Sequence, residues 1–212
     1  ELLESRLAEL SGQLENLGEP GARAKALLDS GYILVDLERF EEAWNVAQEA
    51  FDIAVPAQNW EHAVQAADIM SQTEHEDAMK ALAHGIWLGV TYPIDPELSV
   101  AVLERLIEET PPNADGAAVA AATSSYIVDM RAEGKQREDL LFFTGQRMGE
   151  VARKHSNGSV DSQEMFDFWL ERFELNDPGA FLPRLAQILD VMVPEGQWWF
   201  DRDELRSKIP QE

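Results

Sequence analysis

The chain contains no cysteine in its 212 residues, which excludes disulfide bonds, thiol catalysis and cysteine-ligated metal centres. No run of apolar residues approaches the roughly 20 that a membrane-spanning helix needs. No leader made of a charged, an apolar and a small segment in succession is visible at the N-terminus. Together these absences predict a cytoplasmic protein that has no membrane partner.

Positive charge is scarce, because 40 acidic residues stand against 17 lysines and arginines and give a formal net charge of −23. Such a charge repels nucleic-acid phosphates and anionic membrane surfaces, so we expect neither as a partner. One interpretation is a solvated acidic surface that keeps the protein soluble. The other is a surface for a basic or amphipathic protein partner. Apolar residues make up 45% of the chain, which is enough for a real core.

Recognisable catalytic and metal-binding motifs are also missing. The chain has neither a GxxxxGK phosphate loop nor a GxSxG nucleophile elbow. None of its histidines has another histidine three or four residues away, or a glutamate three residues before it. The sequence therefore predicts no catalytic residue, no metal and no cofactor. The alternative is a sensor or enzyme that binds a metal or cofactor in the region of His62, His75 and His84.

The clearest pattern in the chain is a helical hairpin over residues 24–56. Small and apolar residues recur at helical spacing in a first arm up to residue 37, and again in a second arm from about residue 41. Residues 36–40 between them are enough only for a tight turn. Gly31 costs about 1 kcal/mol relative to alanine inside a helix. We therefore expect a close helix crossing at Gly31, with Ala43 and Ala50 facing it from the second arm.

This hairpin resembles a tetratricopeptide repeat (TPR). With Ala43 set at the family's small position near the start of the second helix, Gly31 falls on the family's glycine. Phe40 then takes the aromatic position of the turn, and Ala50 takes the second small position. Pro56 lies one place beyond the closing proline. The resemblance implies an array of helical pairs.

The resemblance weakens along the chain. Leu27 stands in place of the family's tryptophan, and Ala47 stands in place of its phenylalanine. The following unit repeats the scheme with His75 at the aromatic position, so the resemblance covers about residues 24–92. The period of about 34 to 35 residues is the one expected for stacked helical pairs.

The sequence as a whole predicts an all-α protein of about nine helices. Antiparallel helical hairpins are expected to stack as a TPR-like α-solenoid, followed by a less regular C-terminal helical bundle. We divide the chain into a leucine-rich N-terminal helix (1–20), a TPR-like hairpin region (21–155) and a C-terminal bundle segment (156–212). The alanine-rich segment 114–130 is expected at the centre, because a helix so poor in bulk suits close packing on several sides.

Leucines in residues 1–17 recur at alternating steps of four and three, which is a heptad seam about two heptads long. In one interpretation the seam packs on the first hairpin as a cap. In the other it joins two copies of the chain as a homodimer. The leucines are Leu3, Leu7, Leu10, Leu14 and Leu17.

Positive charge is concentrated between residues 131 and 154, where six basic residues stand against four acidic ones. We expect these charges to pair with acidic neighbours on adjacent helices. The basic residues are Arg131, Lys135, Arg137, Arg147, Arg153 and Lys154.

The resemblance implies a non-enzymatic interaction module, that is, an adaptor, an assembly factor or a chaperone-like scaffold that binds a peptide or helix of a partner. In the family the first helix of each pair lines a concave surface, and here this surface would carry Lys25, Leu28, Tyr32, Trp60 and Met70. Tyr32, Trp60 and Met70 would form an apolar strip suited to an amphipathic helix, or to a peptide with apolar and basic residues. An alternative occupant of the strip is the helix of residues 1–17.

A second candidate partner-binding site is the aromatic run Trp198, Trp199 and Phe200. Three adjacent residues cannot all face one side of a helix, and tryptophan is a favoured anchor at interfaces. The alternative is that the three rings close the end of the helical stack.

Overall fold

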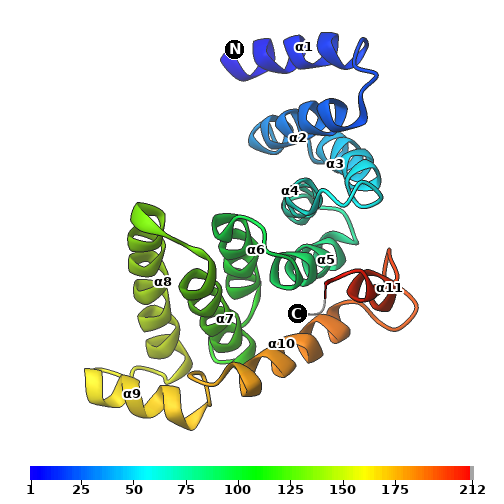
Figure 1. Cartoon of the computed structure of the whole chain (residues 1–212). Coiled ribbons are helices and arrows are strands. Elements are labelled where there is room, and N and C mark those ends of the chain that lie inside the picture. The colour runs from blue at the N-terminus through cyan, green and yellow to red at the C-terminus, as the bar shows by residue number, and fades with distance from the viewer. Residues whose placement is uncertain (211–212) are drawn as a thin grey trace.

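The computed structural model describes residues 1–210 and contains eleven α-helices and no strand within that range (Figure 1). The all-α prediction is confirmed, but the expected number of about nine helices was too low. The last helix has only six residues, too few for a periodic pattern to reveal it. The helices are α1 (Leu2–Leu14), α2 (Pro20–Asp36), α3 (Phe40–Ala54), α4 (Trp60–Ser71), α5 (Ala78–Thr91), α6 (Pro96–Glu109), α7 (Asp115–Arg131), α8 (Gly134–His155), α9 (Gln163–Arg172), α10 (Pro178–Met192) and α11 (Arg202–Ser207).

Three helical hairpins, α2–α3, α4–α5 and α6–α7, form the body of the molecule and stack in chain order. Their first helices contact one another, α2 with α4 and α4 with α6, and α8 continues the stack on α7. Figure 1 shows the stack descending from α1 to α5 and then turning toward α8, with α2, α4 and α6 on the inside of the bend. The predicted solenoid of helical hairpins is therefore the architecture of this chain.

Helix starts follow the local sequence. The Asp95 carboxylate accepts a 3.0 Å hydrogen bond from the N–H of Glu97, and Pro96 occupies the first turn of α6. Asp177 does the same for the N–H of Gly179 at the start of α10. Short polar side chains satisfy the free N–H groups of a first turn, and proline fits there because it has no N–H to satisfy.

Glycines allow the hairpins to approach closely. A Cβ atom at Gly31 would lie 2.9 Å from Cδ1 of Ile69 in α4 and 3.4 Å from Cγ2 of Val46 in α3. At Gly85 it would lie 2.8 Å from Cβ of Ala67. The close crossing expected at Gly31 is confirmed, although its nearest neighbours are not the alanines that the sequence suggested.

The N-terminal helix α1 packs on α2 within the same chain. Leu7 and Leu10 of the heptad seam are buried there, while Leu3 remains exposed. The seam therefore caps the first hairpin, and its two central leucines are not available to a second copy.

The C-terminal segment returns to the hairpins. Helix α10 packs on α7 and α5, and residues 198–200 reach the aromatic side chains of α3 and α5. The alanine-rich α7 contacts α6, α8 and α10, which confirms its expected central position. Where one domain would end and the next begin stays a prediction. Within residues 1–210, no helix combines the length and the apolar character needed to cross a membrane.

Candidate interaction surface

The inner side of the bend carries a hydrogen-bonded chain of side chains across three hairpins. Asp68 of α4 accepts a 2.5 Å bond from Nε of Arg105 in α6 and a 3.3 Å bond from the hydroxyl of Tyr32 in α2. Asp68 is nearly buried, whereas Arg105 is about one-third exposed. Burial, followed by the nearby Asp68 charge, raises the pKa of Tyr32 well above its ordinary value. The network ties the first helices of the hairpins together, so it is a structural element of the inner face.

The apolar strip predicted on this face is not an open surface. Met70 is fully buried and Leu28 is 2% exposed, so neither side chain is available to a partner. Tyr32 is half-buried and bonded to Asp68. Trp60 stacks on Tyr92 with ring centroids 4.1 Å apart. The structure thus removes Leu28 and Met70 from the predicted surface, because neighbouring helices cover them, whereas a partner-binding role for Lys25, Tyr32 and Trp60 stays a prediction.

Each of the three histidines considered as a possible cofactor region has its own partners. His62 bonds to the Asn59 side chain, and burial, followed by the charge of Lys25, lowers its pKa. His75 stacks on Trp44 with centroids 3.7 Å apart. His84 is fully buried. Within the described part of the chain, no group of three or more histidine and carboxylate side chains is placed to hold a metal ion.

The aromatic run near the C-terminus packs back on the hairpins. The Trp199 ring stacks on His84 with centroids 4.1 Å apart, and the backbone N–H of Trp199 donates a 2.9 Å hydrogen bond to His84 Nε2. Phe200 lies beside Phe51 of α3, and the Arg202 guanidinium lies 4.0 Å from the Trp198 ring. The run therefore covers α3 and α5, although Trp199 keeps 39% of its surface exposed. A role for these three residues in partner binding stays a prediction.

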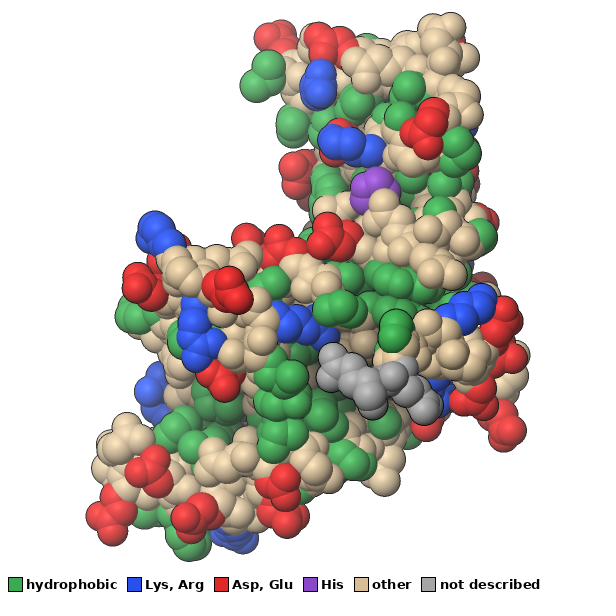
Figure 2. Space-filling model, in the orientation of Figure 1, with side chains coloured by type: hydrophobic (Ala, Val, Ile, Leu, Met, Phe, Trp, Pro, Cys, Tyr) green, Lys and Arg blue, Asp and Glu red, His purple; other side chains and the backbone are tan. Residues whose placement is uncertain are grey.

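Acidic side chains do not gather in one patch on the visible face of the molecule. Figure 2 shows Asp and Glu scattered over the upper arm and the lower block, with apolar and uncharged surface between them. This scattered distribution agrees with the first interpretation of the net charge, a solvated acidic surface that keeps the protein soluble. The acidic charge by itself therefore marks no binding site on that face.

Exposed apolar side chains do concentrate, on α8 and α9. Among residues 1–210, these two helices hold five of the eleven large apolar side chains that are exposed. Phe142 is 69% exposed and Phe168 is 56% exposed. Met165 and Phe168 lie three residues apart and so share one side of α9, and exposed apolar groups on one side of a helix are typical of interaction surfaces. The five are Leu141, Phe142, Phe143, Met165 and Phe168. Sequence reasoning missed them because the same helices also carry buried residues, such as Met148 of α8 and Trp169 of α9, whose helical spacing predicts only an inner face.

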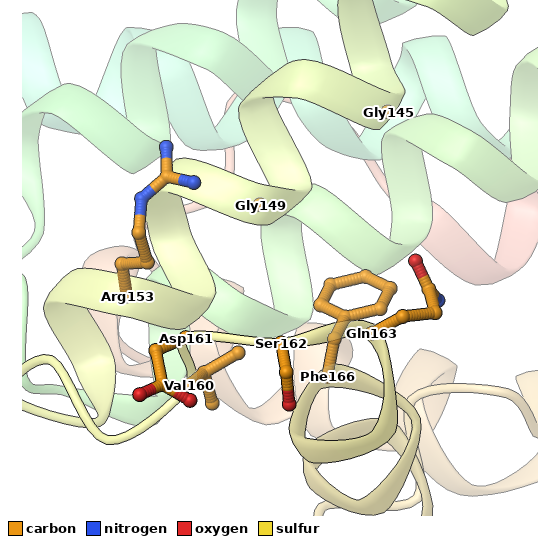
Figure 3. Close-up of a pocket in the computed structure, with 8 residues that line it drawn as sticks. All are labelled: Gly145, Gly149, Arg153, Val160, Asp161, Ser162, Gln163 and Phe166. Atoms are coloured by element: carbon orange, nitrogen blue, oxygen red, sulfur yellow. The ribbon is translucent and has the colours of Figure 1, made fainter.

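A cleft of about 350 Å³ separates α8 from the start of α9 (Figure 3). Gly145 and Gly149 form its α8 side, and the Phe166 ring rises from α9 toward them. Arg153 extends along α8 in the direction of Gly149, whereas the carboxylate of Asp161 points the other way. We call this space the α8–α9 cleft. Its lining residues are Gly145, Gly149, Arg153, Val160, Asp161, Ser162, Gln163 and Phe166.

Unpaired positive charge lies at the same end of the molecule. Fourteen of the 17 lysines and arginines bond to an acidic side chain or a backbone carbonyl. Arg153, Lys154 and Arg172 make no such bond with any of residues 1–210. We call these three the free cations. The expected pairing of the basic segment 131–154 with acidic neighbours on adjacent helices is correct for Arg137 with Asp129 and for Arg147 with Glu104. It is wrong for Lys135, which pairs with Asp139 of its own helix, for Arg131, which bonds to backbone carbonyls, and for the free cations Arg153 and Lys154.

No protein-family model, no curated protein and no solved structure matches this chain. The fold itself defines the class, an all-helical stack of hairpins. Its distinguishing surface is the end formed by α8 and α9, which carries exposed apolar side chains, the α8–α9 cleft with Arg153 in its lining, and Arg172 in the adjoining hollow.

Proposed function

We propose that this protein is a non-enzymatic interaction module, a divergent TPR-like scaffold that binds a segment of another protein. The observation that carries the proposal is the concentration of exposed apolar side chains on α8 and α9. Burying one such phenylalanine is worth about 1.5 to 3 kcal/mol, so covering several of them gives a partner substantial binding energy.

The place of α8 in the stack supports this proposal. Each earlier hairpin helix is covered by the helix that follows it, as α2 is by α3 and α6 is by α7. Helix α8 packs on α7 but makes only slight contact with α9. One side of α8 therefore remains without a covering helix from residues 1–210. A partner that packs there would extend the stack in the way the chain already packs its own helices.

Affinity capture with the full chain as bait tests the function. The bait is compared with a variant carrying Phe142→Ser and Phe168→Ser, both at exposed positions where loss of the ring leaves the core unchanged. We expect at least one protein from the native cell extract to be retained by the unmodified chain and lost from the variant. A matched control, Leu2→Ser with Val191→Ser, changes two exposed apolar residues elsewhere and is expected to retain it. Identical sets of bound proteins on all three baits would contradict the proposal.

A further inference from the structure

We propose that the α8–α9 cleft binds an acidic amphipathic helix, with small residues facing the glycines and carboxylates facing Arg153 in the cleft and Arg172 beside it. This inference rests on the proposed function, because it specifies the chemistry of the partner at the same end of the molecule. Three independent features of the cleft carry it: its floor, its length and its charge.

The floor of the cleft admits another backbone at close range. A Cβ at Gly145 would meet no atom within 4 Å, and one at Gly149 would meet only the end of Arg153, at 3.9 Å. By contrast, the helical glycines Gly31 and Gly85 are covered by neighbouring helices at 2.9 Å and 2.8 Å. Glycines four residues apart lie one above the other on a helix. They therefore leave a shallow groove on α8 that the ridge of a second helix would fill.

The groove has the length of a helical segment. Phe142, Gly145, Gly149 and Arg153 follow one another at steps of three and four, so they share one stripe of α8. At 1.5 Å per residue this stripe spans roughly 16 Å, about three turns of a partner helix. The exposed Phe142 ring stands at one end and the Arg153 guanidinium at the other. An apolar residue of the partner would pack on Phe142, and its acidic end would reach Arg153.

The charge of the cleft selects an acidic partner. In a chain of net charge −23, the three cations that bond neither an acidic side chain nor a backbone carbonyl of residues 1–210 lie at the end of α8 and on α9, and of these Lys154 faces a separate hollow beside Glu108. Arg153 lines the cleft, and Arg172 lines the adjoining hollow on the other side of Val160. Arg172 is exposed, and its guanidinium lies 5.5 Å from the Phe173 ring. A carboxylate on the partner would give these cations the pairing that the chain's other cations already have.

Acidic residues of the chain also lie near this site, and they restrict where the partner's carboxylates bind. Asp161 lines the cleft, with its carboxylate directed away from Arg153. Glu150 is engaged by Arg147 at 3.1 Å, on the neighbouring turn of α8. The partner's negative charge therefore belongs at the Arg153 end of the groove, and uncharged residues belong beside Asp161.

Selection from a library tests the inference without a known partner. A display library of random 16-residue helical peptides, unbiased in charge, is selected against the full chain, and the enriched peptides are sequenced. We expect enriched peptides with a net negative charge and a ridge of alanine, glycine or serine at four-residue spacing. Arg153→Glu and, separately, Gly149→Leu should each weaken their binding at least tenfold. Peptides that are enriched for basic residues, or whose binding neither variant changes, would overturn the inference.

Two matched controls separate the cleft from general effects. Lys135→Glu makes the same charge change as Arg153→Glu on the same helix, where the side chain is exposed and lies outside the cleft. Gly12→Leu makes the same change as Gly149→Leu at another open helical glycine, on α1. Both controls should leave peptide affinity within twofold of the unmodified chain. Circular dichroism melting curves confirm that every variant compared is folded.

The same experiment distinguishes this inference from the proposed function. The enriched peptides could lose affinity for the double variant Tyr32→Ala with Trp60→Ala and keep it for Arg153→Glu. This result would overturn the cleft as the binding site, but it would leave the proposed function, an interaction module, in place. A selection that enriches no peptide, together with affinity capture that finds no partner, would overturn both.

Discussion

The backbone N–H of Trp199 donates a 2.9 Å hydrogen bond to Nε2 of His84, a residue 115 positions earlier in the chain. Nδ1 of the same ring lies 2.7 Å from the carbonyl oxygen of Lys80, which can only accept. The ring is therefore neutral, with its proton on Nδ1 and a lone pair on Nε2 facing Trp199. His84 therefore joins the aromatic contacts and α10 in holding the C-terminal segment on α5.

Protonation of His84 is expected to weaken the fold as pH falls. Burial, above all, lowers the pKa of His84 from 6.5 to about 4, and the charges of Lys80 and Arg202 act in the same direction. Between these two values the unfolded chain binds a proton that the folded chain does not. The stabilisation is therefore complete above about pH 6.5 and is lost progressively as pH falls toward 4. The loss is about 3 kcal/mol of unfolding free energy, at 1.36 kcal/mol per pKa unit.

Chemical denaturation at several pH values, with the unmodified chain and His84→Gln side by side, measures this effect. The many carboxylates contribute equally to both curves, so the difference between the two curves isolates the histidine. That difference should shrink by about 3 kcal/mol between pH 7 and pH 4. Parallel curves over this range would show that the His84 ring is not responsible.

Two glycines with different surroundings should respond to alanine with opposite signs. Gly85→Ala places a Cβ 2.8 Å from Cβ of Ala67, an atom fixed to the backbone of α4 that cannot move aside. Overpacking of this kind costs about 1 to 3 kcal/mol. Gly145→Ala meets no atom within 4 Å and should stabilise α8 by up to about 1 kcal/mol. Thermal unfolding of both variants checks the pair, and a stabilised Gly85→Ala variant would refute the close packing of α4 on α5.

The inner network is expected to depend mainly on Asp68. Asp68→Ala leaves the Arg105 guanidinium and the Tyr32 hydroxyl without their shared acceptor, so it should lower the unfolding free energy by about 3 kcal/mol. Tyr32→Phe removes only one 3.3 Å hydrogen bond and should cost about 1 kcal/mol or less. The matched control is Asp29→Ala, whose exposed pair with Lys25 is worth about 0 to 1 kcal/mol. Urea titrations in which Asp68→Ala costs no more than Asp29→Ala would contradict this account of the network.

Local signals in the sequence predicted local structure well. An aspartate followed by proline predicts a helix start, and Asp95 and Asp177 each begin a helix, because a cap acts within its own turn. The sequence from Thr73 to Glu76 also has the pattern of a capping box, which predicts a helix start at Thr73, but this prediction is wrong. Helix α5 begins later, at Ala78, and the Thr73 hydroxyl instead donates to the carbonyl of Met70. The Thr73 side chain therefore bonds to the end of α4 instead of capping the start of α5.

The candidate surface was harder to predict, because it depends on which side of each helix is left uncovered. Met70 and Leu7 both recur at helical spacing, but this spacing does not show whether a neighbouring helix covers the side chain. Both side chains are buried in the structure. The free cations could be recognised only after the other basic residues had found partners across different helices, such as Arg147 with Glu104. No spacing rule predicts the Arg147–Glu104 pair, since it joins residues that are 43 positions apart in the chain.

Site-specific photo-crosslinking tests the central claim most directly, that a partner protein docks on the end formed by α8 and α9. A photoreactive phenylalanine analogue replaces Phe142, whose ring is 69% exposed, and in a separate control it replaces Leu2, which is 84% exposed at the opposite end. After irradiation in native cells, we expect a defined protein adduct from position 142 and none from position 2. Equal adducts from both positions, or no adduct from position 142, would contradict the claim.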